Sequence, residues 1–162
     1  MSRKHRTEAD YDVSAERLLT VLTDPEFLAT REKAQGAVDA SADVVRRQGG
    51  ELVVRVDATE HGRTMTGGVD RSKRQSSRTT HTWDLSSLHD HWVYEGSQGD
   101  KVRVEGSFDI QRTGDESSRL VSEFSVDVSI PLIGSKIEKI VIDEIKKAEP
   151  RSADILERFL RR

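Results

Sequence analysis

Apolar and polar side chains alternate along most of this chain, with the two-residue period of β-strands. The pattern is clearest over residues 120–130, where Leu120, Phe124, Val126 and Val128 share one face and mainly serine and acidic side chains fill the other. A strand with one apolar face belongs to a sheet that is covered on one side. The pattern therefore predicts a sheet whose apolar face packs against a second layer.

The same alternation predicts further strands between turn signals. We expect strands over residues 5–13, 37–47, 51–60, 79–85, 91–96, 101–112 and 120–130. Glycine-containing turns follow several of these strands, as is typical of antiparallel hairpins. Residues 61–78 carry almost no apolar side chains, so we expect a long polar connection there, holding an irregular strand or a mobile flap.

Helices are predicted at two places. Ser14 and Asp24 are residue types that cap helix N-termini, and Pro25 suits a first helical position, so two short helices should follow the first strand. After Gly134 the apolar residues fall on one helical stripe, which predicts a long C-terminal helix. Pro150 lacks the amide hydrogen for an interior helical bond, so we expect it to kink or break that helix.

Together these elements predict an α+β protein. A curved antiparallel sheet of about six to seven strands should wrap around the long C-terminal helix, with two short helices after the first strand. At 162 residues the chain is long enough to bury a core, and we expect one domain over residues 1–162.

Two motifs connect this order of elements to a known family. They are Asp24-Pro25-Glu26-Phe27 and the run Ile130-Pro131-Leu132-Ile133-Gly134-Ser135-Lys136-Ile137-Glu138. With the element order, which covers nearly the whole chain, they resemble the START-like superfamily (SRPBCC, helix-grip, polyketide cyclase-like), and within it an uncharacterised branch of unknown function. The resemblance implies a sheet that grips a helix around a hydrophobic cavity. Members bind lipids, sterols, polyketides or plant hormones, and some are cyclases or aromatases.

Composition narrows the chemistry. The chain has no cysteine, which excludes disulfides and cysteine-ligated zinc, and its net charge of −3 gives no overall electrostatic case for nucleic acid. No run of about 18 apolar residues is present, and no apolar stretch follows the basic N-terminus, so we expect neither a transmembrane helix nor a secretory signal. We therefore expect a cytoplasmic protein whose partner is a hydrophobic small molecule. Its oligomeric state and a transient membrane contact stay open.

The candidate ligand site is the apolar face of the sheet together with the helical stripe opposite it. It comprises Val54, Val56, His81, Trp83, Trp92, Tyr94, Val104, Phe108, Phe124, Val126, Ile137, Val141 and Ile145. Aromatic walls with few polar groups are typical of small-molecule pockets, and His81 and Tyr94 would orient a ligand by hydrogen bonds. Any one of these residues alone is better explained by core packing, so the hypothesis depends on the set.

Histidines suggest an alternative site. His89 and His91 have the spacing of neighbours on one strand face, and with His81 they would form a three-histidine metal site. We do not favour it, because residues 88–90 resemble a turn and His91 is out of phase with Trp92. We expect no metal and no other cofactor.

A short basic cluster lies in the polar connection. It consists of Arg71, Lys73, Arg74 and Arg78. No aromatic residues are interleaved with it, so a solvated loop is the simpler interpretation, and binding of a phosphate or head group is the alternative.

The residues leave three functions open. The first is non-catalytic binding or transport of a hydrophobic or amphipathic molecule, such as a lipid, sterol or polyketide-like compound. The second is a cyclase- or aromatase-like enzyme in which His81, Tyr94 or Glu144 moves a proton, which needs at least two ionisable groups inside the cavity. The third is an interaction module with a filled core and no cavity.

Overall fold

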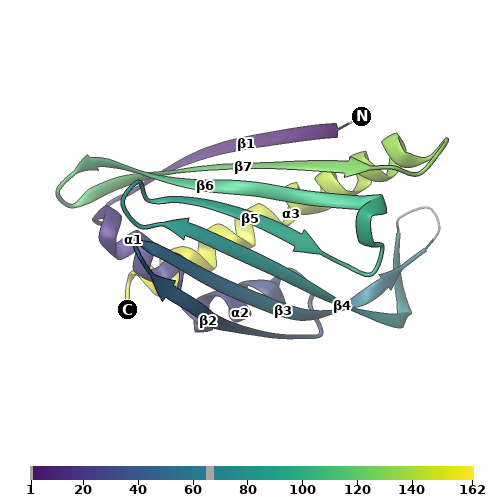
Figure 1. Cartoon of the computed structure of the whole chain (residues 1–162), viewed down its shortest axis with the longest axis horizontal. Coiled ribbons are helices and arrows are strands. Elements are labelled where there is room, and N and C mark those ends of the chain that lie inside the picture. The colour runs from purple at the N-terminus through teal and green to yellow at the C-terminus, as the bar shows by residue number, and fades with distance from the viewer. Residues whose placement is uncertain (1, 65–67) are drawn as a thin grey trace.

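The computed structural model describes residues 2–64 and 68–162, which form a seven-stranded antiparallel sheet and three α-helices. In chain order the elements are β1 (Ser2–Tyr11), α1 (Ala15–Leu22), α2 (Pro25–Ala34), β2 (Asp39–Gln48), β3 (Glu51–Arg63), β4 (Val69–Asp84), β5 (His89–Glu95), the short 3₁₀ helix η1 (Gly99–Lys101), β6 (Val102–Gly114), β7 (Ser117–Val128) and α3 (Gly134–Leu160). The strand order is β1-β7-β6-β5-β4-β3-β2. Figure 1 shows α3 running along one side of the curved sheet, so the predicted helix-grip fold is confirmed.

The two short helices start where the capping residues predict. The Ser14 hydroxyl accepts a hydrogen bond from the Arg17 amide at 3.1 Å, and an Asp24 carboxylate oxygen accepts one from the Glu26 amide at 2.9 Å. Phe27 of α2 packs edge-to-face on Phe159 near the end of α3, with ring centroids 5.5 Å apart. The short helices and the end of α3 therefore close one end of the grip.

The interior holds two apolar clusters. The helix-end cluster contains buried residues of α1, α2, the sheet and the end of α3: Ala15, Leu18, Val21, Leu22, Phe27, Leu28, Leu52, Val54, Val56, Trp83, Leu88, Ile110, Leu120, Ile155, Leu156 and Phe159. The corner cluster lies under the start of α3 and contains Val104, Phe124, Val126, Val128, Ile137 and Ile142. The space between sheet and helix is thus apolar at both ends.

The polar stretch at 61–78 is more regular than predicted. β3 continues to Arg63 and β4 begins at Val69, with a register shift between His61 and Gly62. The last partner of β4 in β5 is Glu95, opposite Arg78, so the earlier residues of β4 pair with β3 alone. We call residues 60–63 and 69–75 the ribbon, and Figure 1 shows it projecting past the sheet. Of the two predicted alternatives, an irregular strand and a mobile flap, the described residues agree with the first, because they form a two-stranded ribbon with a register shift. Residues 65–67 lie outside the described chain.

β5 also begins earlier than predicted. The turn before it ends at Leu88, whose φ of 56° is left-handed, and the strand starts at His89. The prediction of a turn over 88–90 is wrong at its last two positions, because backbone pairing with β4 and β6 extends to His89. This places Asp90 within the sheet.

Pro150 does not break the last helix. α3 is continuous from Gly134 to Leu160 with Pro150 inside it. Proline removes one interior hydrogen bond, but Ile155, Leu156 and Phe159 beyond it are buried in the helix-end cluster. Their burial holds the last turns in place.

The corner between β7 and α3 is fixed by a buried carboxylate and a close backbone contact. Glu138 is 1% exposed and accepts a hydrogen bond from the Val128 amide at 2.9 Å. A Cβ at Gly134 would lie 2.5 Å from the Val128 carbonyl oxygen, so the glycine allows the helix to approach the strand. The left-handed backbone is at Leu132 (φ 72°), not at Gly134. The glycine and glutamate of the motif thus hold α3 against the end of β7.

Candidate ligand-binding site

The predicted site residues all lie between the sheet and the helices. Val54, Val56 and Trp83 belong to the helix-end cluster, with Phe108 packed against it. The corner cluster includes Val104, Phe124, Val126 and Ile137, with Trp92, Tyr94, Val141 and Ile145 packed against it. His81 is 3% exposed and carries its imidazole between rings of both groups, those of Phe108 and Trp92. The structure therefore brings the set together along one interior space.

This interior is not uniformly closed. Trp92, Tyr94, Val141 and Ile145 face it but are only partly buried. α3 packs against β1 and β7 of the sheet and against α1 and α2, so its closest contacts avoid the middle strands. We call the space beside these four inward-facing, solvent-reached side chains, between α3 and the middle of the sheet, the groove.

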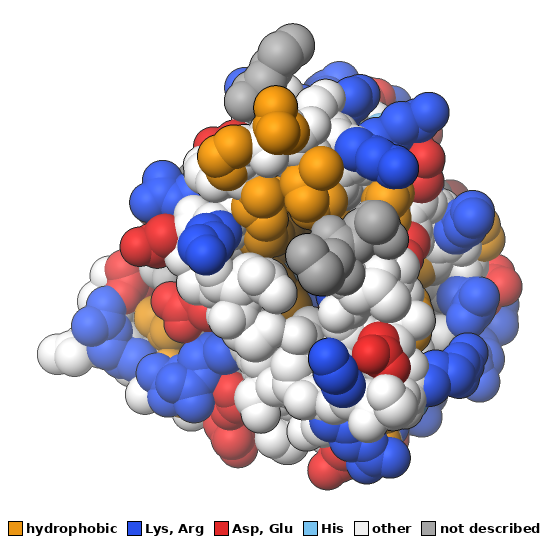
Figure 2. Space-filling model, turned by 90° about the vertical axis from the view of Figure 1, so that its right-hand side faces the viewer, with side chains coloured by type: hydrophobic (Ala, Val, Ile, Leu, Met, Phe, Trp, Pro, Cys, Tyr) orange, Lys and Arg blue, Asp and Glu red, His pale blue; other side chains and the backbone are white. Residues whose placement is uncertain are grey.

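The groove opens at the end opposite the short helices. Figure 2 looks at that end and shows apolar side chains gathered around a hollow, with Lys and Arg side chains at its margin. Exposed apolar residues near this end include Leu132 and Ile133 of the corner before α3, and Val69 at the start of β4. An apolar opening of this kind suits the passage of an apolar ligand.

Four inward-facing residues on β4 and β5 form a compact square. His81 pairs with Trp92 across the two strands, and Trp83 pairs with Asp90. We call these four residues the polar block. Trp83 is 1% exposed, Asp90 0% and His81 3%, whereas Trp92 is partly buried, like Tyr94, the next inward residue toward the open end.

A short hydrogen bond fixes the histidine of the block. His81 Nδ1 lies 2.6 Å from Asp90 Oδ2. A carboxylate in this position accepts a hydrogen bond from an Nδ1–H, and in that tautomer Nε2 is the acceptor of the ring. The imidazole is also stacked on Phe108 with ring centroids 6.0 Å apart. His81 is therefore held in one orientation.

Each residue of the polar block has a buried polar atom without a protein partner. These atoms are His81 Nε2, Asp90 Oδ1, Trp83 Nε1 and Trp92 Nε1, judged over the described residues. An unsatisfied buried polar atom costs about 1–3 kcal/mol, and four in one square are rare in a packed core. The block offers two acceptors and two donors to a polar group placed against it.

A second polar group lies nearer the opening. Glu60 accepts hydrogen bonds from the Ser77 hydroxyl and the Tyr94 hydroxyl, both at 3.1 Å. Burial, reinforced by the charge of Glu60, raises the pKa of Tyr94, which therefore stays neutral and donates. Burial also raises the pKa of Glu32 on α2; Arg31 opposes this, and Glu60 and His81 act on it more weakly. Ionisable groups thus converge inside the grip, and the interior is not wholly apolar.

Gly106 makes room for the block. It pairs with Trp92 on the neighbouring strand, and a Cβ there would lie 2.5 Å from the Trp92 ring and 2.3 Å from the Glu123 carbonyl oxygen. The indole therefore lies across the backbone of β6, which only a glycine permits.

Sequence reasoning missed Asp90, Glu60, Glu32 and Gly106. Asp90 was hidden by the predicted turn, although it has the same phase as Trp92 and would have been found by extending the alternation backward. The other three contact the site through pairing and helix placement, for which the sequence has no local signal.

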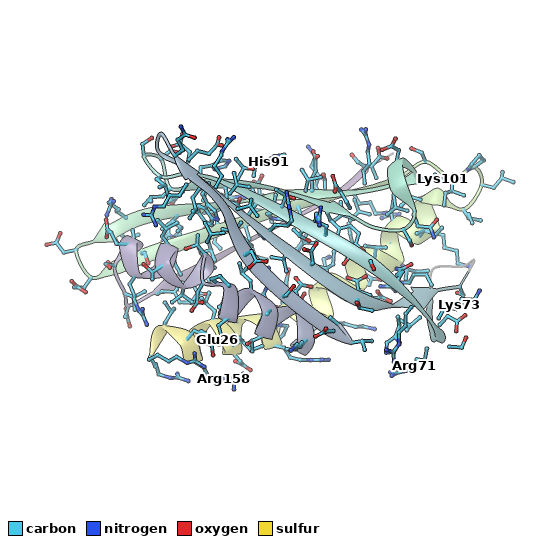
Figure 3. All side chains as sticks on the ribbon, turned by 60° about the horizontal axis from the view of Figure 1, so that its bottom comes forward. Glu26, Arg71, Lys73, His91, Lys101 and Arg158 are labelled. Carbon is cyan, nitrogen blue, oxygen red and sulfur yellow. The ribbon has the colours of Figure 1, made fainter. Side chains whose placement is uncertain are left out.

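The alternative three-histidine site is not assembled. His81 is inside, whereas His89 and His91 are exposed on the other face, as predicted for His91 (Figure 3). No group of three metal-ligating side chains is found among the residues described. His89 instead lies 3.5 Å from Asp109, forming a second, exposed histidine–aspartate pair.

Glu144, a candidate proton-transfer residue, lies at the margin of the groove. Its side chain is 36% exposed and its carboxylate is 2.6 Å from Arg63 of β3. This ion pair links α3 to β3, so Glu144 is not aligned with the polar block.

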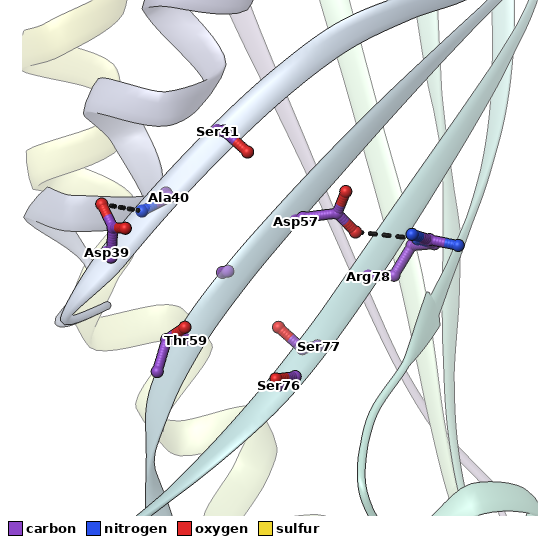
Figure 4. A pocket seen from close by; sticks show the side chains of 9 residues that line it. Asp39, Ala40, Ser41, Asp57, Thr59, Ser76, Ser77 and Arg78 are labelled. Carbon is purple, nitrogen blue, oxygen red and sulfur yellow. Dashed lines mark hydrogen bonds and ion pairs between the residues drawn. The ribbon is translucent and has the colours of Figure 1, made fainter.

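The basic cluster lies on a strand, not in a loop. Arg71, Lys73, Arg74 and Arg78 are all exposed on β4, and Figure 3 shows Arg71 and Lys73 on the projecting ribbon. Arg78 Nε is 2.7 Å from Asp57 Oδ1. A polar depression of about 320 Å³ surrounds this pair on the outer face of the sheet (Figure 4), opposite the polar block. Exposed ion pairs of this kind contribute little to stability.

Solved structures of the same fold are similar over the whole chain. TTHA0849 from Thermus thermophilus is 23% identical with a TM-score of 0.64, covering 98% of this chain and 97% of its own. The Zhui aromatase/cyclase from Streptomyces sp. R1128 is 14% identical with a TM-score of 0.60, covering 99% and 92%. A START superfamily protein from Mycobacterium smegmatis is 18% identical with a TM-score of 0.53, covering 94% and 98%. At these identities the likeness shows the fold, which is START-like.

Sequence comparison gives the family. No curated protein matches the chain. None of the helices described is both long and apolar enough to span a bilayer. A family model described as a protein of unknown function (DUF2505) matches residues 6–160. The chain therefore belongs to the DUF2505 family and has the START-like helix-grip fold.

Proposed function

We propose that the protein binds an amphipathic small molecule between the sheet and α3. The polar end of the ligand lies against the polar block, and its apolar part extends along the corner cluster toward the opening. Lipids, sterols and polyketide-like compounds with a hydroxyl or carbonyl group have this chemistry.

The observation that carries this proposal is the set of four unpartnered polar atoms in one square, judged over the residues that the structure describes. A hydroxyl or carbonyl group can accept from a tryptophan Nε1–H, and a hydroxyl can also donate to His81 Nε2. Such a group would remove a desolvation cost of about 1–3 kcal/mol for each atom that it pairs. A filled, cavity-less core would leave this cost in place, so an interaction module is the weaker interpretation.

The apolar wall supplies the affinity. Trp92, Tyr94, Val141 and Ile145 are inward-facing and only partly buried, so a ligand would cover apolar surface that now meets solvent. Each Å² covered contributes about 25 cal/mol. The similarity to an aromatase/cyclase and to a START superfamily protein supports the same space as the binding site.

Native mass spectrometry of the protein purified from its own cells tests the proposal. We expect a species heavier than the 18.2 kDa chain that releases a small organic molecule on activation. Anilinonaphthalene sulfonate, an amphipathic fluorescent probe, should bind the protein and be displaced by the released molecule.

Matched variants locate the site. Trp92→Phe keeps the aromatic ring but removes the Nε1 donor, so affinity for the released molecule should fall about tenfold, the effect of one hydrogen bond. His91→Gln, the exposed neighbour on the same strand, should bind like the wild type. Equal affinity in all three proteins would contradict the assignment of the block as the polar anchor.

A further inference from the structure

The polar block contains a histidine, His81, that is held in one orientation by a buried carboxylate. A residue that only anchors a ligand by a hydrogen bond does not need such an orienting partner. We propose that His81, oriented by Asp90, is a general base that removes a proton from a carbon acid bound in the groove. The substrate class is an apolar compound with a C–H bond next to a carbonyl or comparable electron-withdrawing group. This inference rests on the proposed function, because the substrate must first enter the same groove.

The pair has the arrangement of a base and its orienting group. Asp90 Oδ2 is 2.6 Å from His81 Nδ1, and both side chains are buried, at 0% and 3% exposure. With its proton on Nδ1, the ring presents the Nε2 lone pair, and that atom has no partner among the described residues. A buried, oriented acceptor beside a carboxylate that stabilises the imidazolium is the requirement for general-base chemistry.

The other ionisable groups of the interior are less suited to this role. The Tyr94 hydroxyl donates a hydrogen bond to Glu60, and Glu60 already accepts two hydrogen bonds. Glu144 is paired with Arg63 at the margin of the groove. His81 Nε2 is therefore the acceptor on an interior ionisable side chain that has no existing partner among the described residues.

The tryptophans supply the complementary donors. Trp83 Nε1 and Trp92 Nε1 belong to the same square and have no partner among the described residues. When the C–H bond breaks, its electron pair forms the enolate and the proton forms an N–H bond on His81 Nε2. The indole N–H groups would stabilise the enolate oxygen. Return of the proton to another atom of the same substrate completes an isomerisation that needs no further reactant.

A Kemp elimination measures the base directly. The probe 5-nitrobenzisoxazole is an apolar aromatic carbon acid; the base takes its C3 proton, the C–H electrons form the nitrile, and the N–O bond breaks to release a coloured phenolate. We expect a saturable rate above that of buffer. Displacement of anilinonaphthalene sulfonate by the probe measures its binding separately.

Two variants and two controls assign the activity. His81→Gln removes the base, and Asp90→Asn removes the carboxylate that fixes the tautomer and stabilises the imidazolium, with nearly unchanged shape. In both, kcat should fall about 100-fold with KM nearly constant. The exposed pair at 3.5 Å provides the controls: His89→Gln and Asp109→Asn should react like the wild type.

Nitrogen-15 NMR gives a readout that does not depend on the probe. The His81 imidazole should carry its proton on Nδ1 and have an unprotonated Nε2. A neutral ring with the proton on Nε2 would overturn the inference. A bound probe that reacts no faster than in buffer, or equally fast in His81→Gln, would also overturn it while leaving the binding proposal intact. Failure of both the native ligand and the fluorescent probe to bind would instead refute the proposed function.

Discussion

Glu32 is a carboxylic acid held mostly inside the grip. Burial is the main reason that its pKa is raised above the ordinary value of 4.5, and Arg31 offsets only part of the effect. The folded state therefore retains the Glu32 proton at pH values where the unfolded chain has lost it. Wherever the folded state binds more protons, the free energy of unfolding falls as the pH rises. Glu32 thus costs no stability below pH 4.5 and increasingly more above it, up to its folded pKa.

Glu32→Gln should remove this cost. We expect the variant to be more stable than the wild type near neutral pH and to lose that advantage below about pH 4, where the carboxyl is protonated in both states. Urea denaturation at a series of pH values measures the difference. Glu26→Gln on the exposed face of the same helix is the control, and a Glu32→Gln advantage that persists at low pH would show that the burial of charge is not its cause.

Individual residues show how far the sequence alone could go. The aromatic wall and His81 were predictable, because strand alternation assigns side chains to a face without knowledge of the partner strand. The same alternation would also have assigned Asp90 to the inward face if the predicted strand had begun two residues earlier, at His89. Gly106 was not, since its role depends on an indole from the neighbouring strand.

Among the elements, α3 carries an evident internal weakness. Pro150 is exposed and lies inside a continuous helix, where it leaves one interior carbonyl without its amide partner. Pro150→Ala should restore that hydrogen bond and raise the free energy of unfolding by about 1–3 kcal/mol. Urea denaturation checks the change. Lys147→Ala, an exposed substitution in the same helix, should stay within about 0.5 kcal/mol. A Pro150→Ala protein that is less stable would mean that the packing of the last turns requires the proline.

Element boundaries were predictable where the signal is local. Ser14 and Asp24 cap the helices through their own side chains, so sequence and structure agree there. The ribbon was predicted only as one of two alternatives, an irregular strand or a mobile flap, because its residues are polar and its strands are specified by backbone pairing with each other. Apolar residues alternate with polar ones where one face of a strand is buried. The ribbon lies outside the covered part of the sheet, so its strands bury little apolar surface and show no such alternation.

At the scale of the molecule, the two ends of the grip differ in construction. The short helices and the Phe27–Phe159 contact close one end, whereas apolar side chains surround a hollow at the other (Figure 2). The resemblance implied a cavity between sheet and helix, but not where it opens or that a polar block lies within it. Those features depend on how distant segments are placed, which neither composition nor period encodes.

The ribbon gives the open end a different exchange behaviour from the rest of the sheet. Its two strands pair only with each other, apart from the Ser72 amide, which bonds to the Asp70 side chain, and isolated two-stranded structure is marginal in water. We expect hydrogen–deuterium exchange at residues 60–63 and 69–75 to proceed by local opening, much faster than at residues 52–58 of the same β3 strand. Mass spectrometry of peptic fragments measures this gradient, and equal protection along β3 would contradict it. Fast exchange there would mean that the border of the opening unfolds and reforms many times while the core stays intact, so a ligand too wide for the resting opening could pass without unfolding of the protein.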